Sequence, residues 1–143
     1  MNKNELETQK LTEEQIKEAA DEDYMNKEQL QFFKELLIEL HESTNLRIQE
    51  FKDQIANPVE LSDESDRATW EEQCAISFRI VEREQKLLPK IQQALERIRL
   101  GDYGYCLESG EPIGIQRLLI RPTAEYCADI KTIKEIKEHF YKN

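Results

Sequence analysis

The chain has 143 residues and a net charge of −10, with 38% apolar and 35% charged residues. This length fits one domain or a small domain with a long appendage, and the acidity argues against a protein that binds DNA directly, which must neutralise phosphates. There is no run of about 18 apolar residues to span a membrane, and no apolar segment marks a secretory signal, so we expect a cytoplasmic protein.

Residues 1–25 are polar and acidic, and we expect this N-terminal region to pack on the base of the fold. Thr12-Glu13-Glu14-Gln15 matches a capping box, in which the threonine and glutamine side chains each bond to the other's backbone N–H. The box predicts a short helix that begins after Thr12 and continues to about Ala20.

Residues 26–100 carry the pattern of a coiled-coil hairpin with its tip near 58–68. The first arm alternates spacings of three and four at Leu30, Phe33, Leu37, Leu40, Thr44, Arg47 and Phe51. The second arm repeats in the same way at Ile80, Glu84, Leu87, Ile91, Ala94 and Ile98. Asn57-Pro58 ends the first arm, and the short linker makes the arms antiparallel. We expect Pro89, inside the second arm, to kink the helix.

Residues 101–126 predict a turn-rich knot shaped like a zinc finger, and residues 127–143 a C-terminal helix. The fold class is therefore mainly α, a long antiparallel hairpin on a small globular base. The four zinc-ligand positions of the knot are Cys106, Ser109, Cys127 and Ile130. A tetrahedral zinc site needs four good donors, and here a serine and an isoleucine replace two cysteines. We therefore expect no structural zinc, with Ile130, Leu107 and Tyr126 packing where the metal would be.

Several strings of residues, all in one order, resemble the DksA/TraR family of transcription factors. They are Asp63-x-x-Asp66-Arg67-Ala68, Gly104-Tyr105-Cys106, Ile113-Gly114-Ile115-x-Arg117-Leu118, Arg121-Pro122-Thr123-Ala124 and Cys127-x-x-x-Lys131-Thr132. Tyr24-Met25-Asn26, at the entry to the hairpin, also fits. The resemblance covers nearly the whole chain and is closest to the longer members of the family, which have an N-terminal region.

The resemblance implies a partner and a mode of action. Members of this family bind bacterial RNA polymerase without touching DNA and insert the coiled-coil tip through the secondary channel. There they alter the stability of open complexes, in the stringent response, together with guanosine tetraphosphate (ppGpp). Family members with incomplete cysteine sets also suggest a factor that works when zinc is scarce.

The resemblance also assigns roles to residues. Asp63, Asp66 and Ala68 would form the tip that modulates the polymerase, although acids at these positions also cap helices and favour the helix dipole. Arg117 would contact the polymerase rim, or alternatively pack its stem on the knot. The ppGpp contacts would be Arg83, Leu87, Lys90, Arg121 and Lys131. Basic side chains, arginine above all, suit pyrophosphate groups.

Two other functions remain as alternatives. A coiled-coil scaffold protein without polymerase activity would depend on the flanks of the hairpin rather than on Asp63 and Asp66. A zinc-ribbon protein that binds nucleic acid is disfavoured by the net charge and the missing ligands. We expect no enzyme, because there is no nucleophile motif or glycine-rich phosphate loop. An intramolecular hairpin can bury its own apolar seam, which favours a monomer.

Overall fold

The computed structural model describes residues 11–56, 64–128, 130, 133–134 and 136–137. In this part of the chain the elements are α2 (Glu13–Glu18), the 3-10 helix η1 (Asp21–Asp23), α3 (Lys27–Ala56), α4 (Glu64–Leu100) and α5 (Ile115–Ile120). No strand occurs among these residues beyond an isolated antiparallel bridge between Tyr105 and Pro112. The mainly α fold class is confirmed.

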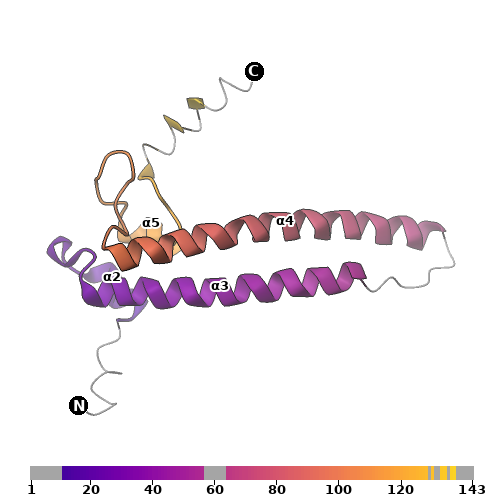
Figure 1. Cartoon of the computed structure of the whole chain (residues 1–143), viewed down its shortest axis with the longest axis horizontal. Helices are drawn as coiled ribbons and strands as arrows, with labels where there is room; N and C mark the ends of the chain where they lie inside the picture. The colour runs from indigo at the N-terminus through magenta and orange to yellow at the C-terminus, as the bar shows by residue number, and fades with distance from the viewer. Residues whose placement is uncertain (1–10, 57–63, 129, 131–132, 135, 138–143) are drawn as a thin grey trace, which may run out of the picture. The chain divides into compact units, whose positions relative to one another are not determined.

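The chain divides into two compact units, and the long helices belong to both. Unit 2 is Ile38–Gln92, and unit 1 contains the remaining segments on either side of it. Within each unit α3 and α4 lie side by side and antiparallel (Figure 1), which confirms the predicted hairpin. Among the described residues, no helix is both long and apolar enough to cross a membrane.

The ends of the helices follow the local sequence signals. The capping box of α2 is present, since Gln15 N donates to Thr12 Oγ1 at 3.2 Å and Thr12 N donates to Gln15 Oε1 at 3.0 Å. Helix α2 ends at Glu18, two residues before the predicted end. Helix α4 ends at Leu100, before Gly101 with its φ of +83°, as glycine at this position predicts.

Pro89 does not interrupt α4, which is helical from Glu64 to Leu100. Proline lacks the N–H that would donate to the carbonyl of Gln85, one turn earlier. Both residues are exposed, so water can take the place of the missing donor.

The seam, the buried line of contact between α3 and α4, differs from the predicted spacing in two places within unit 2. Ile48 is buried where we expected Arg47, and Val81 is buried where we expected Ile80. A straight α-helix has 3.6 residues per turn, so its buried face drifts away from a strict seven-residue repeat and steps of four accumulate. Glu84 is buried at its predicted seam position.

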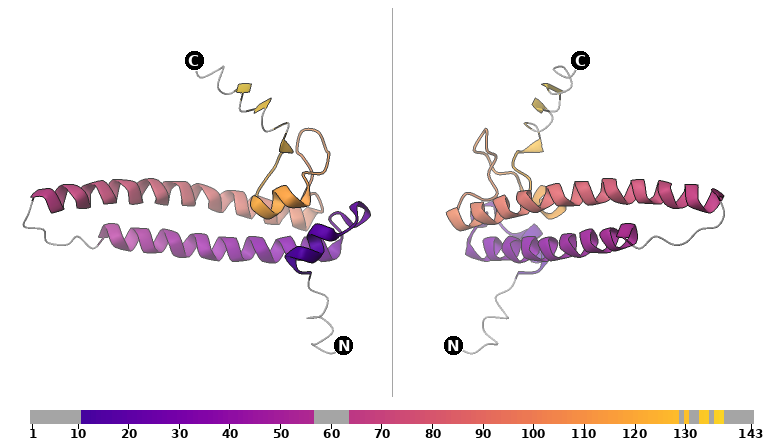
Figure 2. Two further views of the ribbon diagram at one scale, coloured as in Figure 1. Left: turned by 180° about the vertical axis from the view of Figure 1, so that it is seen from behind. Right: turned by 45° about the vertical axis from the view of Figure 1, so that its right-hand side comes forward.

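Unit 1 assembles the knot from segments that are far apart in sequence. Helix α2 contacts α5, and Figure 2 shows the two short helices beside the start of α3 and the end of α4. The core of this unit includes Ile16, Phe33, Tyr103 and Leu118, each at most 1% exposed.

Candidate functional site

Backbone hydrogen bonds shape the knot around the first ligand-like position. Cys106 N donates to Glu111 O at 2.8 Å, and Ile113 N donates to Gly104 O at 2.8 Å. Gly110 N closes the turn by donating to Cys106 O at 2.9 Å. Leu107 N donates to Glu125 O at 2.9 Å, which ties this turn to the segment before Cys127. These bonds form the shape of a zinc knuckle from the backbone alone.

Tyr24 pins the N-terminal region to the knot. Its hydroxyl donates to Gly104 O and accepts from Gly114 N at 3.0 Å. Its ring meets the Tyr105 ring edge to face, with centroids 5.5 Å apart. Burial raises the pKa of Tyr24, and the hydrogen bond from Gly114 opposes that rise. The neutral hydroxyl can therefore both donate and accept, as this position between two glycines requires.

Tyr103 holds the other side of the knot. Its side chain is fully buried, and its hydroxyl donates to Pro122 O at 2.7 Å. Its ring packs on Phe33 of α3 with centroids 5.5 Å apart. Burial raises the pKa of this hydroxyl, so Tyr103 stays protonated and keeps the bond to Pro122.

Two ion pairs tie further segments to the base. Arg97 of α4 lies 3.6 Å from Glu125, while its Nη2 atom is buried and has no hydrogen-bond partner among the described residues. Lys134 lies 3.1 Å from Glu108 and 4.5 Å from the centroid of the Tyr126 ring. The second cluster connects the turn after Cys106 to the segment that follows Cys127.

Cys106 lies at the centre of the knot and is 3% exposed. Burial raises the pKa of the Cys106 thiol. Hydrogen bonds from the Ser109 side chain and from the backbone of Ser109, Cys127 and Glu108 together have the larger, opposite effect, so the pKa is lowered to about 6. These hydrogen bonds favour the thiolate form of Cys106. Cys106 and Cys127 are both free thiols.

The residues at the four ligand positions do not fit a tetrahedral zinc ion. The Ser109 side chain and the Cys127 backbone lie against the Cys106 thiol, but Ser109 Oγ also accepts a bond from Glu111 N at 3.3 Å. Ile130 is half-buried and has no donor atom. Among the described residues, no three His, Cys, Asp or Glu side chains are placed to hold a metal. Two thiols and an engaged hydroxyl fall short of the four donors that zinc requires.

The expected apolar replacement of the metal is wrong in one respect. Leu107 is 54% exposed, so it does not fill the space that a metal would take. Its backbone N–H donates to Glu125 O at 2.9 Å. The hydroxyls of Tyr24 and Tyr103 connect the knot to other segments through hydrogen bonds to its backbone.

The tip residues are only partly described. Asp66 and Ala68 lie in the first turns of α4 and are exposed, whereas Asp63 lies outside the described residues. Among the expected ppGpp contacts, Arg83, Leu87 and Lys90 lie on successive turns of α4 in unit 2. Arg83 is 75% exposed, and Lys90 is exposed as well.

The remaining basic residues belong to unit 1. Arg121 follows α5 and is exposed, and Lys131 lies outside the described residues. Arg117 is half-buried within α5, and its Nε donates to Tyr126 O at 3.1 Å. This contact supports the structural alternative for Arg117 without removing a role in binding.

Sequence reasoning missed Tyr103, Arg97 and Lys134, and it noted Tyr24 only as part of a motif. A tyrosine beside a glycine in a turn-rich segment was the available signal for Tyr103. No spacing could have paired Tyr24 with Gly104, because 80 residues separate them.

Two family models match consecutive parts of the chain. The model described as DnaK suppressor protein DksA, N-terminal domain, matches residues 29–98. The prokaryotic dksA/traR C4-type zinc finger matches residues 101–129. The first match covers the hairpin and the second covers the knot with its degenerate ligand positions.

Individual relatives match over most of the chain. The RNA polymerase-binding transcription factor DksA of Haemophilus influenzae is 41% identical over 122 residues, which cover 82% of each chain. The protein of that name from Escherichia coli K12 is 38% identical over 129 residues, which cover 87% of this chain and 83% of the relative. The solved structure of transcription factor DksA2 from Pseudomonas aeruginosa is 42% identical, with a TM-score of 0.76, and covers 90% of this chain and 99% of that one.

Proposed function

This chain belongs to the DksA/TraR family, and on that basis we propose that it binds bacterial RNA polymerase directly and regulates transcription. The observation that carries the proposal is about 40% identity to factors named for polymerase binding, continuous across the hairpin and the knot. We also infer that the protein is cytoplasmic and not an enzyme, since the polymerase performs the chemistry.

The proposed mode of action places the tip of the hairpin in the secondary channel of the polymerase, where it alters the stability of open complexes. Exposed Asp66 in the first turn of α4 supports this role, because a carboxylate there can act on a magnesium site or on basic loops. A net charge of −10 favours contact with a positively charged channel over contact with DNA.

The proposed co-effector is ppGpp, bound where the factor meets the polymerase. Arg83, Lys90 and Arg121 are exposed cations that suit its pyrophosphates, and Leu87 on the same face as Arg83 and Lys90 offers an apolar contact. Lys131 completes the proposed set. Arg117 is proposed as a contact with the polymerase rim.

The test is multi-round transcription from a ribosomal RNA promoter by purified polymerase, with this protein titrated in the presence and absence of ppGpp. We expect inhibition that ppGpp deepens. Lys90→Ala should weaken the effect of ppGpp, whereas Lys86→Ala, an exposed cation one turn away, serves as the matched control. If folded protein has no effect at any concentration, the coiled-coil scaffold is the better account.

We infer further that the knot folds without structural zinc. The poor donor set supports this inference, as do the hydrogen bonds from Tyr24 and Tyr103 that connect its segments. We expect well under one zinc per purified chain by elemental analysis, and the same circular dichroism melting curve with and without a strong chelator. Stoichiometric zinc that a chelator removes with loss of structure would contradict it.

A further inference from the structure

The seam of unit 2 is half polar. Among the described residues of Ile38–Gln92, the buried apolar side chains are Ile48, Val81 and Ile91. Thr44, Ser77 and Glu84 are buried beside them. Thr44 Oγ1 bonds back to Leu40 O of its own helix at 2.6 Å, so it needs no partner across the seam. Glu84 is different, because a buried carboxylate is costly unless a cation faces it.

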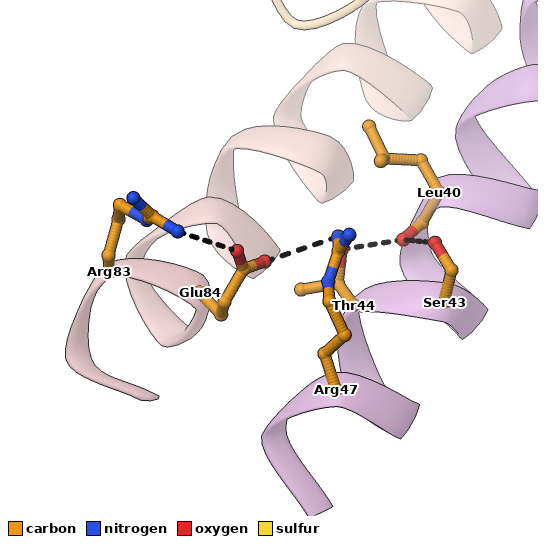
Figure 3. Close-up of polar contacts among 6 residues, drawn as sticks. All are labelled: Leu40, Ser43, Thr44, Arg47, Arg83 and Glu84. Carbon is orange, nitrogen blue, oxygen red and sulfur yellow. Dashed lines mark hydrogen bonds and ion pairs between the residues drawn. The ribbon is translucent and has the colours of Figure 1, made fainter. Parts of the chain in front are cut away.

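The cation that faces Glu84 is Arg47, on the opposite helix of the seam. Arg47 Nη2 of α3 lies 3.4 Å from Glu84 Oε2, and the side chain of Glu84 is 10% exposed (Figure 3). Arg83 also lies 3.6 Å from the carboxylate, but it directly precedes Glu84 on the same helix. The contact between Arg83 and Glu84 can therefore form in any alignment of α4 with α3. The contact between Arg47 and Glu84 can form only when the two helices are aligned as observed.

The observed alignment is the one that gives Glu84 a partner on α3. Sliding antiparallel helices by three, four or seven residues keeps a helical face on the seam. Those slips would bring Glu84 opposite residues that carry no positive charge: Leu40, Ser43, Thr44, Glu50, Phe51 and Gln54. The few buried apolar side chains could form new apolar contacts after such a slip, whereas the buried carboxylate would lose its positively charged partner on α3.

We propose that Glu84 and Arg47 set the register of the hairpin in unit 2. They are a positioning pair: their contact selects one alignment of α3 and α4 over slipped alignments that would bury the same kinds of apolar side chain. A single polar seam position that fixes register at some cost in stability is well attested in coiled coils.

The pair also has a consequence that rests on the proposed function. A slip of seven residues displaces one helix along the other by about 10 Å at 1.5 Å per residue. The start of α4, with Asp66, would then move relative to α3. Register is thus a condition for presenting the tip carboxylate at a fixed depth in the channel.

The experiment follows the methyl resonances of Ile48, Val81 and Ile91 by NMR in the full chain. We expect one set of resonances in the wild type and a second set in Glu84→Leu, with a melting temperature that does not fall. Leucine can be buried at the seam, and the Arg47 side chain is 46% exposed, so water can solvate its charge once the carboxylate is gone. Glu82→Leu, on the exposed face two residues away, should keep one set. A single unchanged set in Glu84→Leu would overturn the proposal.

A charge exchange provides an independent test of the same pair. Arg47→Glu should lower the melting temperature by about 5 °C, because two carboxylates then meet at the seam. The double variant Arg47→Glu with Glu84→Lys should recover most of that loss and restore one set of resonances. The fall in melting temperature of the double variant is compared with the sum of the falls in Arg47→Glu and Glu84→Lys alone. If the two are equal, the pair does not act through its charges and the proposal fails. Because these readouts need no polymerase, they stand or fall separately from the proposed function.

Discussion

Asp66→Asn is expected to abolish the effect of the protein on transcription while leaving its affinity for RNA polymerase within about twofold, the range of most exposed substitutions. Asp66 is exposed in the first turn of α4, where its loss removes only a modest interaction with the helix dipole. The substitution keeps the size of the side chain and deletes its charge. If the carboxylate acts at the polymerase centre, function and binding separate.

The measurement pairs the promoter assay with a direct binding assay on the same polymerase preparation. Glu64→Gln is the matched control, because Glu64 is an exposed acid in the same turn and occupies a position that the tip motif leaves unspecified. We expect this control to inhibit transcription as the wild type does. Equal loss of binding and of transcription in Asp66→Asn would show that Asp66 is an ordinary contact residue.

The ends of several helices could be predicted from the sequence because the residues that start and stop a helix lie close to its ends. Proline after Asn57, glycine at 101 and the capping box at Thr12 each act within a few residues. The seam could be predicted only to the precision of a seven-residue repeat. The shift from Arg47 to Ile48 depends on how the helical drift accumulates along α3, which spacing alone does not settle.

The knot could be predicted in outline but not in its supports. The spacing of Cys106 and Cys127 indicated a degenerate zinc finger, and donor chemistry argued that zinc would not fit. The hydrogen bonds that support the knot join residues far apart in sequence, such as Tyr24 with Gly114 and Tyr103 with Pro122. Side-chain hydroxyls that meet backbone groups leave no periodic pattern, so the sequence favoured an apolar filling instead.

Gly104→Ala is expected to destabilise the protein by about 3 kcal/mol, which combines backbone strain with overpacking. Gly104 has a φ of +92°, which side chains rarely tolerate, and an added Cβ would lie 2.8 Å from Met25 Cγ. Gly104 O also accepts the bonds from Tyr24 and Ile113, so the residue cannot move without breaking them. The close approach of Met25 to Gly104 joins the N-terminal region to the knot.

The free energy of unfolding measured in denaturant tests this expectation, with Gly110→Ala as the control. Gly110 has a φ of +72° but nothing within 4 Å of an added Cβ, so it isolates the backbone strain, worth about 1 kcal/mol. The excess loss in Gly104→Ala then measures how tightly Met25 and Tyr24 hold the knot. Were the two variants equally stable, the N-terminal region would not be a support of the knot, and the account of how it folds without zinc would lose its main contact.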